Sequence, residues 1–330
     1  MNLNGKKILF IGPRYFDYAI RIKEEMEKNG GKVVWINSNI RDTGIYNFFV
    51  YKYISSWKNK LRDNYYKKRI PQNFNADIVF VIKGETLSSE IMESIKENNP
   101  KARYIMYQWD SAKAEPNALK LQRYFDKVIT FDYEDAKQYG WYYRPLFYLE
   151  SSFKSWNERK NDISMIGVIH SERIDLLHKL ESFCSSNNLQ LFHHLFCTFL
   201  GFYKCKYLTH DSSYVKAKHN EITHKSLSLK DTYNIYSDSK FIADYTYPGQ
   251  TGFTMRTIEC MGNHCKLITN NKYIKTADFY SEDNIFIYDI NNFKIPEEFM
   301  RKPFVELKTD IMSKYSLQGW LKEVLSFEEY

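Results

Sequence analysis

The sequence predicts an α/β protein of two domains, each built on a parallel sheet covered by helices. Three observations support this prediction. The chain has 330 residues, which exceeds the usual size of one hydrophobic core and suits two domains. Short apolar runs alternate with helical patterns in both halves, as in strand–helix–strand units. A polar stretch, residues 151–162, interrupts the alternation, so we expect domains at residues 1–155 and 156–330.

In the first half, five apolar runs of strand length precede or follow helical patterns. The helical pattern of residues 18–31 places Ala19, Ile22 and Met26 on one face and ends in glycine. The pattern of residues 88–100 begins with serine and ends just before a proline. The strands are expected at residues 6–12, 32–37, 76–84, 102–110 and 126–132.

The second half begins the same alternation again. Residues 162–170 predict a strand and residues 172–183 the helix that follows it. Further strands are expected at residues 189–197, 240–245, 264–269 and 284–289. Ligands of open α/β sheets bind at the carboxyl ends of the strands, so the loops that follow the strands are the places to search for chemistry.

Composition limits the class of protein. The chain is 43% hydrophobic and 26% charged, as expected of a globular protein in water. Its net charge of +7 favours anionic partners such as nucleotides, phosphorylated lipids or membrane surfaces. An odd number of cysteines, five, without a CxxC pair, and an N-terminal apolar run too short for a signal peptide favour reduced thiols. We therefore expect a cytoplasmic protein, located at the inner face of the cell membrane if its acceptor is a lipid.

Residues 249–262 follow an apolar strand and form the strongest candidate for an anion site. Glycines in the Gly249–Gln250–Thr251–Gly252 loop would let the backbone approach a phosphate closely. The helix expected after the loop would direct its unpaired N–H groups at that phosphate. Arg256 and Glu259 are three residues apart and share a face, so one can reach a diphosphate and the other a ribose. The alternative is an ordinary turn and helix with an exposed ion pair.

Residues 236–271 and 279–289, together with 107–140 and 144–148, resemble the GT-B glycosyltransferases of bacterial capsule, lipopolysaccharide and O-antigen synthesis. The resemblance implies that Glu259 holds the ribose of a nucleotide-sugar, and that Arg256 and the Gly249–Gly252 loop face its phosphates. Many retaining members carry two glutamates with seven residues between them. Here the partner position of Glu259 is Thr251. Retention or inversion at the sugar carbon therefore stays open.

Two carboxylates of the first half are candidates for catalysis. Asp110 follows the fourth expected strand and would act as the general base on an acceptor hydroxyl. Glu85, after the third strand, is the rival base. The alternative for Asp110 is a helix cap. On the acceptor side, Gly12 is expected to form the turn that admits substrate, and Arg14 to face the site.

His170 and Arg173 form a second candidate anion site, where the first strand of the second half is followed by a helix. We expect both to face the phosphates of the donor; the alternative for Arg173 is a solvated helix residue. Lys225 and Lys230 would add positive charge there, or serve as plain surface lysines.

No metal or other cofactor is expected. Residues 193–210 contain histidines and cysteines, but their spacing fits no established zinc site and the cysteines stand among apolar residues. No acidic pair of the DxD type occurs in a loop, so helix dipoles and arginine would have to offset the diphosphate charge.

Residues 50–70 are basic and aromatic, and Ile54, Trp57 and Leu61 fall on one face of a helix. Such a helix either lies on an anionic membrane or covers the sheet with its charges in water. Nucleic acid is not an expected partner, because no sequence signature of such a domain is present.

Together these observations predict a glycosyltransferase that moves a sugar from a nucleotide-sugar to a glycan acceptor, carried on a lipid. A nucleotide-sugar epimerase of the same fold is one alternative. A non-enzymatic protein that binds nucleotides or polyanions is the other.

Overall fold

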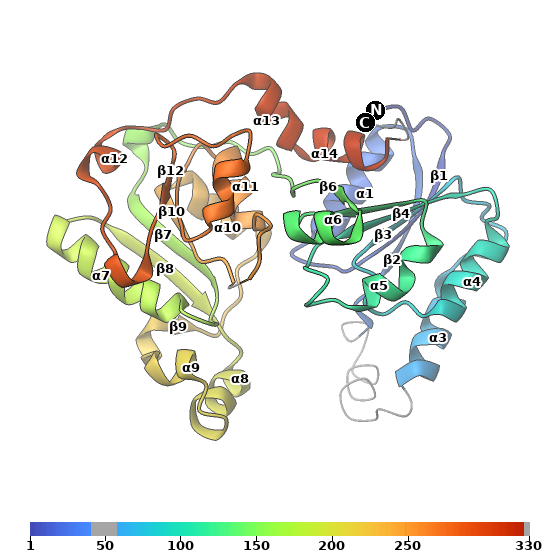
Figure 1. Ribbon diagram of the computed structural model, residues 1–330, viewed down its shortest axis with the longest axis horizontal. Coiled ribbons are helices and arrows are strands. Elements are labelled where there is room, and N and C mark those ends of the chain that lie inside the picture. The colour runs from blue at the N-terminus through green and yellow to red at the C-terminus, as the bar shows by residue number, and fades with distance from the viewer. Residues whose placement is uncertain (41–57, 248, 327–330) are drawn as a thin grey trace. The chain divides into compact units, whose positions relative to one another are not determined.

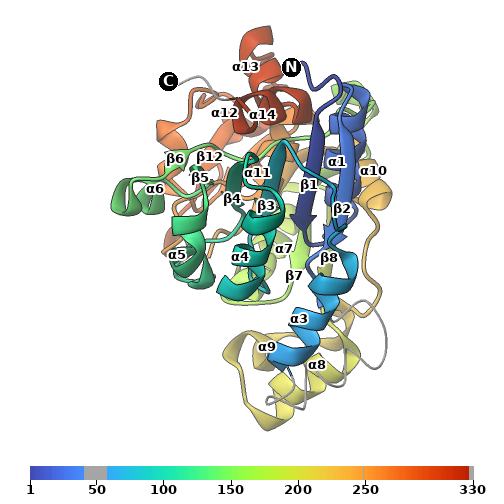
Figure 2. The same ribbon diagram turned by 90° about the vertical axis from the view of Figure 1, so that its right-hand side faces the viewer.

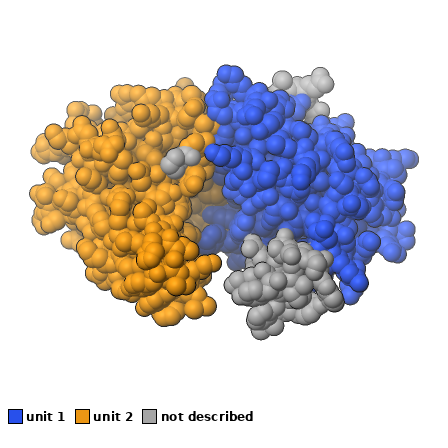
Figure 3. Space-filling model, turned by 60° about the horizontal axis from the view of Figure 1, so that its bottom comes forward, with its two compact units in different colours: residues 1–146, 317–330 blue, residues 147–316 orange. Residues whose placement is uncertain are grey.

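The computed structural model of the protein describes residues 1–40, 58–247 and 249–326. These residues contain two parallel six-stranded sheets with helices between successive strands (Figure 1). The chain divides into two compact units. Unit 1 comprises residues 1–146 and 317–330, and unit 2 comprises residues 147–316 (Figure 3). The predicted fold class, two Rossmann-like α/β domains, is confirmed.

The sheet of unit 1 has the strand order β2-β1-β3-β4-β5-β6. The interior strands are buried along nearly their whole length, which explains why their sequences are continuous apolar runs. The order reverses between β1 and β3, and the carboxyl ends of strands at such a point form a natural ligand site. The strands are β1 (Lys7–Gly12), β2 (Lys32–Asn37), β3 (Ile78–Ile82), β4 (Arg103–Gln108), β5 (Lys127–Thr130) and β6 (Tyr142–Tyr143).

Helices cover both faces of this sheet. The helix α4 begins at a serine cap, where the Ser88 side chain accepts a bond from Ile91 N. The helix α6 begins at Asp132, whose side chain accepts from Glu134 N and Asp135 N. The helices of unit 1 are α1 (Tyr18–Lys28), α3 (Lys58–Arg69), α4 (Ser89–Asn98), α5 (Asn117–Leu121), α6 (Tyr133–Tyr139) and α14 (Leu317–Val324), with the short η3 (Gln122–Tyr124).

The sheet of unit 2 has the order β12-β11-β10-β7-β8-β9, so its order reverses between β7 and β10. The strands are β7 (Asn161–Val168), β8 (Leu191–Phe196), β9 (Ile222–Thr223), β10 (Ser239–Asp244), β11 (Lys266–Thr269) and β12 (Ile285–Ile287). The helices are α7 (Arg173–Asn187), α8 (Phe199–Tyr203), α9 (Ser212–Lys216), α10 (Leu229–Ser237), α11 (Met255–Gly262), α12 (Glu297–Arg301) and α13 (Thr309–Tyr315). Short helical turns are η4 (Trp156–Glu158), η5 (Lys204–Leu208), η6 (His219–Glu221), η7 (Lys272–Thr276) and η8 (Ile290–Asn292).

The division of the chain differs from the predicted one, 1–155 and 156–330, in two places. The boundary lies between residues 146 and 147, and the C-terminal helix α14 belongs to unit 1. Trp320 of α14 is fully buried, with its ring centroid 4.8 Å from that of Tyr107. Glu323 pairs with Arg144 at 2.7 Å. Large aromatic burial of this kind holds α14 on the first sheet.

The basic stretch of residues 50–70 falls only partly within the described residues, because Ile54 and Trp57 lie outside them. The helix α3 packs Tyr65 and Tyr66, both buried, and Leu61 against the core of unit 1. In the part that is described, the apolar face of this helix therefore covers the sheet, which was one of the two predicted alternatives.

No helix in residues 1–40, 58–247 and 249–326 has the length and apolar character needed to cross a membrane.

Candidate functional site

Two arginines meet at the carboxyl edge of the sheet of unit 2, where the strand order reverses. Arg173 follows β7 and Arg256 follows β10. Gly167 shows how close they are, because a Cβ atom at this position would lie 2.8 Å from Arg173 Nη1 and 3.0 Å from Arg256 Nη2. Only glycine leaves room for both guanidinium groups at this point of β7.

Asp244, the last residue of β10, lies between the two arginines and is fully buried. Its carboxylate accepts a bond from Arg256 Nη1 and another, of 2.7 Å, from Thr254 Oγ1. Burial alone would raise the pKa of Asp244, but Arg256 and Arg173 outweigh burial and hold this pKa below its usual range. Asp244 thus faces two guanidinium groups, and Glu259 adds a second negative charge beside Arg256.

Backbone carbonyls fix the Arg173 side chain. Its Nη1 donates to Val168 O at 2.7 Å and its Nη2 to Tyr245 O at 3.3 Å. Burial and the neighbouring Arg256 lower the pKa of Arg173 to about 10, so the group stays charged at neutral pH. Among the described residues, none offers a hydrogen-bond partner to the buried Arg256 Nε. A buried donor without a partner is costly, and an anionic ligand would satisfy it.

The helix α7 begins at the same edge. Its N-terminal residues receive no side-chain cap, and the preceding Ser171 has a left-handed backbone with φ 50°. An uncapped helix N-terminus beside two arginines attracts anions. The structure therefore brings the predicted residues Arg173, Arg256 and His170 together.

His170 is held neutral in this environment. Burial and the charges of Arg173 and Arg256 lower the pKa of His170 to about 4, and Asp244 opposes them only in part. The pKa in the folded state thus lies below the free value near 6.5. Between these two values the unfolded chain binds more protons than the folded one, so stability rises with pH.

We therefore expect the folded protein to lose stability as pH falls from about 6.5 to 4, and His170→Gln to remove part of that loss. The difference should be on the order of 1 kcal/mol, because partial exposure screens the arginine charges. Urea unfolding of both proteins at several pH values measures it. If the free energy of unfolding changes equally with pH in both proteins, the pKa of His170 is not lowered by burial and the two arginines.

The predicted Gly249–Gly252 loop is open at its start and buried at its end. Gly249 has φ 85°, and a Cβ atom there would meet nothing within 4 Å. Thr251 and Gly252 are buried, and Asn271 Nδ2 lies 3.4 Å from Gly252 O. Gln250 Nε2 donates back to Gly252 O at 3.1 Å. Of this loop, the Gly249 end is the part that a ligand can approach.

Glu259 lies in an environment different from the predicted one. It is only 2% exposed, and its carboxylate accepts bonds from Tyr236 Oη at 3.0 Å and Tyr233 Oη at 3.3 Å. Both tyrosines come from α10 and are themselves buried. In this conformation the carboxylate links α11 to α10 inside the unit. Direct contact with a ribose stays a prediction and requires those bonds to open.

We expect Glu259→Gln to lower the free energy of unfolding by about 1–3 kcal/mol, because a buried carboxylate that accepts two hydroxyl bonds loses its charge. Its effect on affinity should be equal for a ribonucleotide and for the 2′,3′-dideoxy analogue. Thermal unfolding and calorimetric titration measure the two quantities. A loss of affinity for the ribonucleotide but not for the dideoxy analogue would show that Glu259 contacts the ribose.

Unit 1 has its own charged cluster at the carboxyl ends of β3 and β4. Lys83, which has a left-handed backbone with φ 66°, buries its side chain at the centre. Its Nζ lies 2.5 Å from Asp110, 4.0 Å from Glu115 and 3.2 Å from Tyr15 Oη. Burial would lower the pKa of Lys83, but Asp110 and Glu85 outweigh it and raise this pKa. The lysine is therefore a fixed cation among three carboxylates.

The predicted base Asp110 pairs with Lys83 and keeps 47% of its side chain exposed, so an acceptor hydroxyl can reach it. The rival Glu85 belongs to the same cluster, since its charge raises the pKa of both Lys83 and Glu115. Burial raises the pKa of Glu115, and Lys83 offsets that rise only in part. The structure thus brings both predicted acids together and adds Lys83 and Glu115.

The acceptor-side roles of Gly12 and Arg14 stay predictions. A Cβ atom at Gly12 would lie 3.0 Å from the Phe10 ring, so this glycine is packed closely against the core. The Arg14 side chain is 57% exposed and pairs with Asp17 at 2.9 Å on the surface. Gly12 therefore lies in a closely packed position, and Arg14 forms an exposed ion pair.

Metal-ligand residue types come together at one place among the described residues. His178, Glu181 and Glu221 have ligand atoms within 4.8 Å of one another. Glu221 already accepts Lys218 N at 2.8 Å and pairs with Lys218 Nζ at 3.0 Å. This arrangement needs no ion, and a requirement for metal stays untested.

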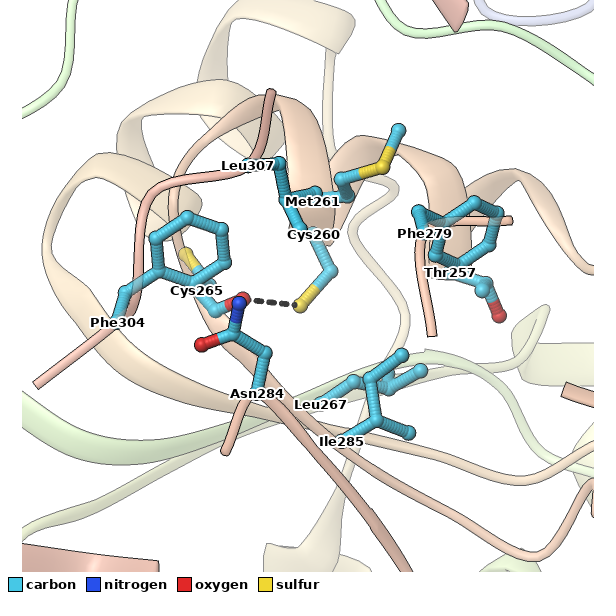
Figure 4. A pocket seen from close by; sticks show the side chains of 10 residues that line it. All are labelled: Thr257, Cys260, Met261, Cys265, Leu267, Phe279, Asn284, Ile285, Phe304 and Leu307. Atoms are coloured by element: carbon cyan, nitrogen blue, oxygen red, sulfur yellow. Dashed lines mark hydrogen bonds between the residues drawn. The ribbon is translucent and has the colours of Figure 1, made fainter. Parts of the chain in front are cut away.

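The pocket in Figure 4 is too small for a substrate. It lies beside α11 and has a volume of about 10 Å³, room for one water at most. Cys260 Sγ donates across it to Cys265 O at 3.2 Å. Both cysteines are buried.

Two Rossmann-like units with these strand orders define the GT-B fold, and solved structures of that fold match the chain. HepE of Anabaena, solved in complex with UDP and glucose, is 12% identical, with a TM-score of 0.58 over 98% of this chain and 100% of that one. Sucrose-phosphate synthase from Thermosynechococcus elongatus is 10% identical, with a TM-score of 0.51 over 87% of each chain. A Listeria monocytogenes protein described as a UDP-N-acetylglucosamine 2-epimerase is 11% identical, with a TM-score of 0.51 over 98% and 95%. No protein-family model and no curated protein sequence matches the chain.

Proposed function

We propose that the protein is a glycosyltransferase that takes a sugar from a nucleotide-sugar and transfers it to a glycan acceptor. The observation that carries this proposal is the pair Arg173 and Arg256, which meet at the buried carboxylate of Asp244 at the switch point of the sheet of unit 2. The uncapped start of α7 and Arg256 Nε, which has no partner among the described residues, add hydrogen-bond donors at this edge. A diphosphate matches two guanidinium groups beside a helix N-terminus.

In the proposed reaction, unit 2 holds the donor and stabilises the departing nucleoside diphosphate. Arg173 and Arg256 would meet the charge that develops on the leaving phosphate, which is where preorganised cations contribute most. In unit 1, Asp110 would accept the proton of the attacking hydroxyl while Lys83 keeps the carboxylate in place. HepE was solved with UDP and glucose, which is in line with a nucleotide-sugar donor.

The finer assignment extends this proposal to bacterial surface polysaccharides. We propose that the acceptor is a glycan carried on a lipid, in the assembly of capsule, lipopolysaccharide or O-antigen. The support is the resemblance of the 236–271 segment to such enzymes and the positive net charge, which favours a membrane rich in anionic lipid.

An epimerase is the second candidate, because the Listeria monocytogenes protein also matches this fold, with a TM-score of 0.51. Such an enzyme would convert its nucleotide-sugar without any acceptor. A transferase would release nucleoside diphosphate at a rate that depends on the acceptor.

A panel of nucleotide-sugars, screened by thermal unfolding, tests the proposal. A donor present at 100 times its Kd should stabilise the protein by about 2.7 kcal/mol. The stabilising donor is then incubated with lipid-linked and soluble glycan acceptors, and the products are separated by mass. Absence of stabilisation by every nucleotide-sugar and nucleoside diphosphate would contradict the donor site.

A further inference from the structure

A small lobe of unit 2, residues 197–221, projects from the carboxyl end of β8. It consists of α8, η5, α9 and η6, and it joins β8 to β9. In both ribbon views α8 and α9 lie beyond the end of the strands, away from the layers of unit 2 (Figures 1 and 2). We call residues 197–221 the α8–α9 lobe.

One face of the lobe is apolar and exposed. Leu200 and Leu208 are 80% and 77% exposed, and Phe199 and Tyr207 are 56% and 51% exposed. Phe199, Tyr203 and Tyr207 follow one another at intervals of four residues along α8 and η5, with ring centroids 4.7 and 5.7 Å apart. Leu200 and Leu208 are eight residues apart in the adjoining row, with Lys204 between them. These five side chains therefore place apolar groups along one helical segment.

The opposite face anchors the lobe. Phe202 is fully buried, and its ring contacts those of His219 at 5.2 Å and Tyr214 at 6.3 Å. Lys206 Nζ donates to Ala217 O and ties η5 to the residue after α9. The exposed leucines thus belong to a packed element, and folding of the chain does not bury them.

The charge of the lobe is positive. Residues 197–221 contain four lysines, Lys204, Lys206, Lys216 and Lys218, against two acids, Asp211 and Glu221. Lys204 is exposed and stands midway between Leu200 and Leu208 in the same row. Leucine and aromatic rings with a lysine at their centre are the composition of a helix that lies in a lipid interface.

We propose that the α8–α9 lobe docks unit 2 on an anionic lipid surface. Leu200, Leu208 and Phe199 enter the boundary between headgroups and acyl chains, and the tyrosine hydroxyls stay at headgroup level. Lys204 meets the lipid phosphates. The lobe extends from the same carboxyl edge as Arg173 and Arg256, so docking holds the anion site of unit 2 near the membrane. This inference does not depend on the proposed glycosyl transfer.

Vesicle binding tests the docking proposal without any activity measurement. The probes are vesicles of phosphatidylcholine alone and of phosphatidylcholine and phosphatidylglycerol in equal amounts. The double variant Leu200→Ser/Leu208→Ser should bind the anionic vesicles roughly tenfold or more weakly than the unaltered protein. Lys204→Glu should weaken binding to the anionic vesicles and leave the weak binding to neutral vesicles unchanged.

A matched control removes two exposed apolar side chains elsewhere in unit 2. Tyr273 and Val305 are 41% and 48% exposed, and Tyr273→Ser/Val305→Ser should bind as the unaltered protein does. Thermal unfolding of each variant checks that the fold is retained, which we expect because Phe202 is untouched.

Three results would overturn the proposal. One is equal binding of the leucine variant and the unaltered protein. Another is loss of binding only in the variant with Lys67, Lys68 and Arg69 of α3 changed to glutamate, which would assign the membrane contact to α3. The third is a concentration-dependent dimer, seen by sedimentation, that the leucine variant abolishes while vesicles are not bound. That result would make the lobe a contact between two copies of the chain.

Discussion

Replacement of Arg256 by alanine should weaken the binding of a nucleoside diphosphate by roughly tenfold or more and leave the affinity for the bare nucleoside almost unchanged. The largely buried guanidinium lies beside Arg173, and its Nε has no partner among the described residues. A charge-assisted hydrogen bond to a phosphate is worth about 1.5–3 kcal/mol, and about 1.4 kcal/mol is a factor of ten in affinity. Calorimetric titration with both ligands measures the difference.

The control variant is Arg301→Ala, which removes an exposed arginine that pairs with Glu297 on α12. This change should leave affinity for both ligands unaltered, because exposed ion pairs contribute about 0–1 kcal/mol. Arg256→Lys keeps the charge opposite Asp244, so it separates loss of ligand contact from loss of folding. Equal affinity for the diphosphate in the unaltered protein and in Arg256→Ala would contradict the assignment of the donor site and the function proposed from it.

The fold could be predicted because its information is local. Each interior strand is buried on both faces, so its sequence is a continuous apolar run that stands out between helical patterns. The C-terminal helix escaped prediction because its partner is distant in sequence. Nothing within α14 shows that Trp320 packs on Tyr107 of the first unit.

The candidate site was predicted in part, for a related reason. Arg173 and Arg256 could be identified because each follows a strand and opens a helix. Asp244 was missed because it ends the apolar run of β10 and looks like the edge of a strand. A carboxylate at the last position of a strand is the signal that could have shown it, since that position faces the ligand edge.

The surroundings of other residues depend on contacts between distant segments, which the spacing of residues in the sequence does not reveal. The interval of three residues places Glu259 beside Arg256 on α11, but the tyrosines of α10 intercept its carboxylate. Lys83 follows β3 and pairs with Asp110 and Glu115, which both follow β4. The apolar residues of the α8–α9 lobe looked like core, and only the fold shows that Leu200 and Leu208 face solvent.

Asp110→Asn should lower the rate of sugar transfer by about 10²-fold or more and leave donor affinity unchanged, because the amide cannot accept the acceptor's proton. The control is Asp17→Asn, which changes a different exposed acid of unit 1. Asp17 pairs with Arg14, and this variant should transfer the sugar at the normal rate. We expect Asp110→Asn to fold, because Lys83 keeps a negative partner: Glu115 lies 4.0 Å from it. Transfer at the normal rate in Asp110→Asn, with a loss in Glu85→Gln, would make Glu85 the base. A loss of donor affinity in Asp110→Asn would instead mean that the cluster binds the donor, because a base in the acceptor half has no influence on the ground-state binding of a nucleotide.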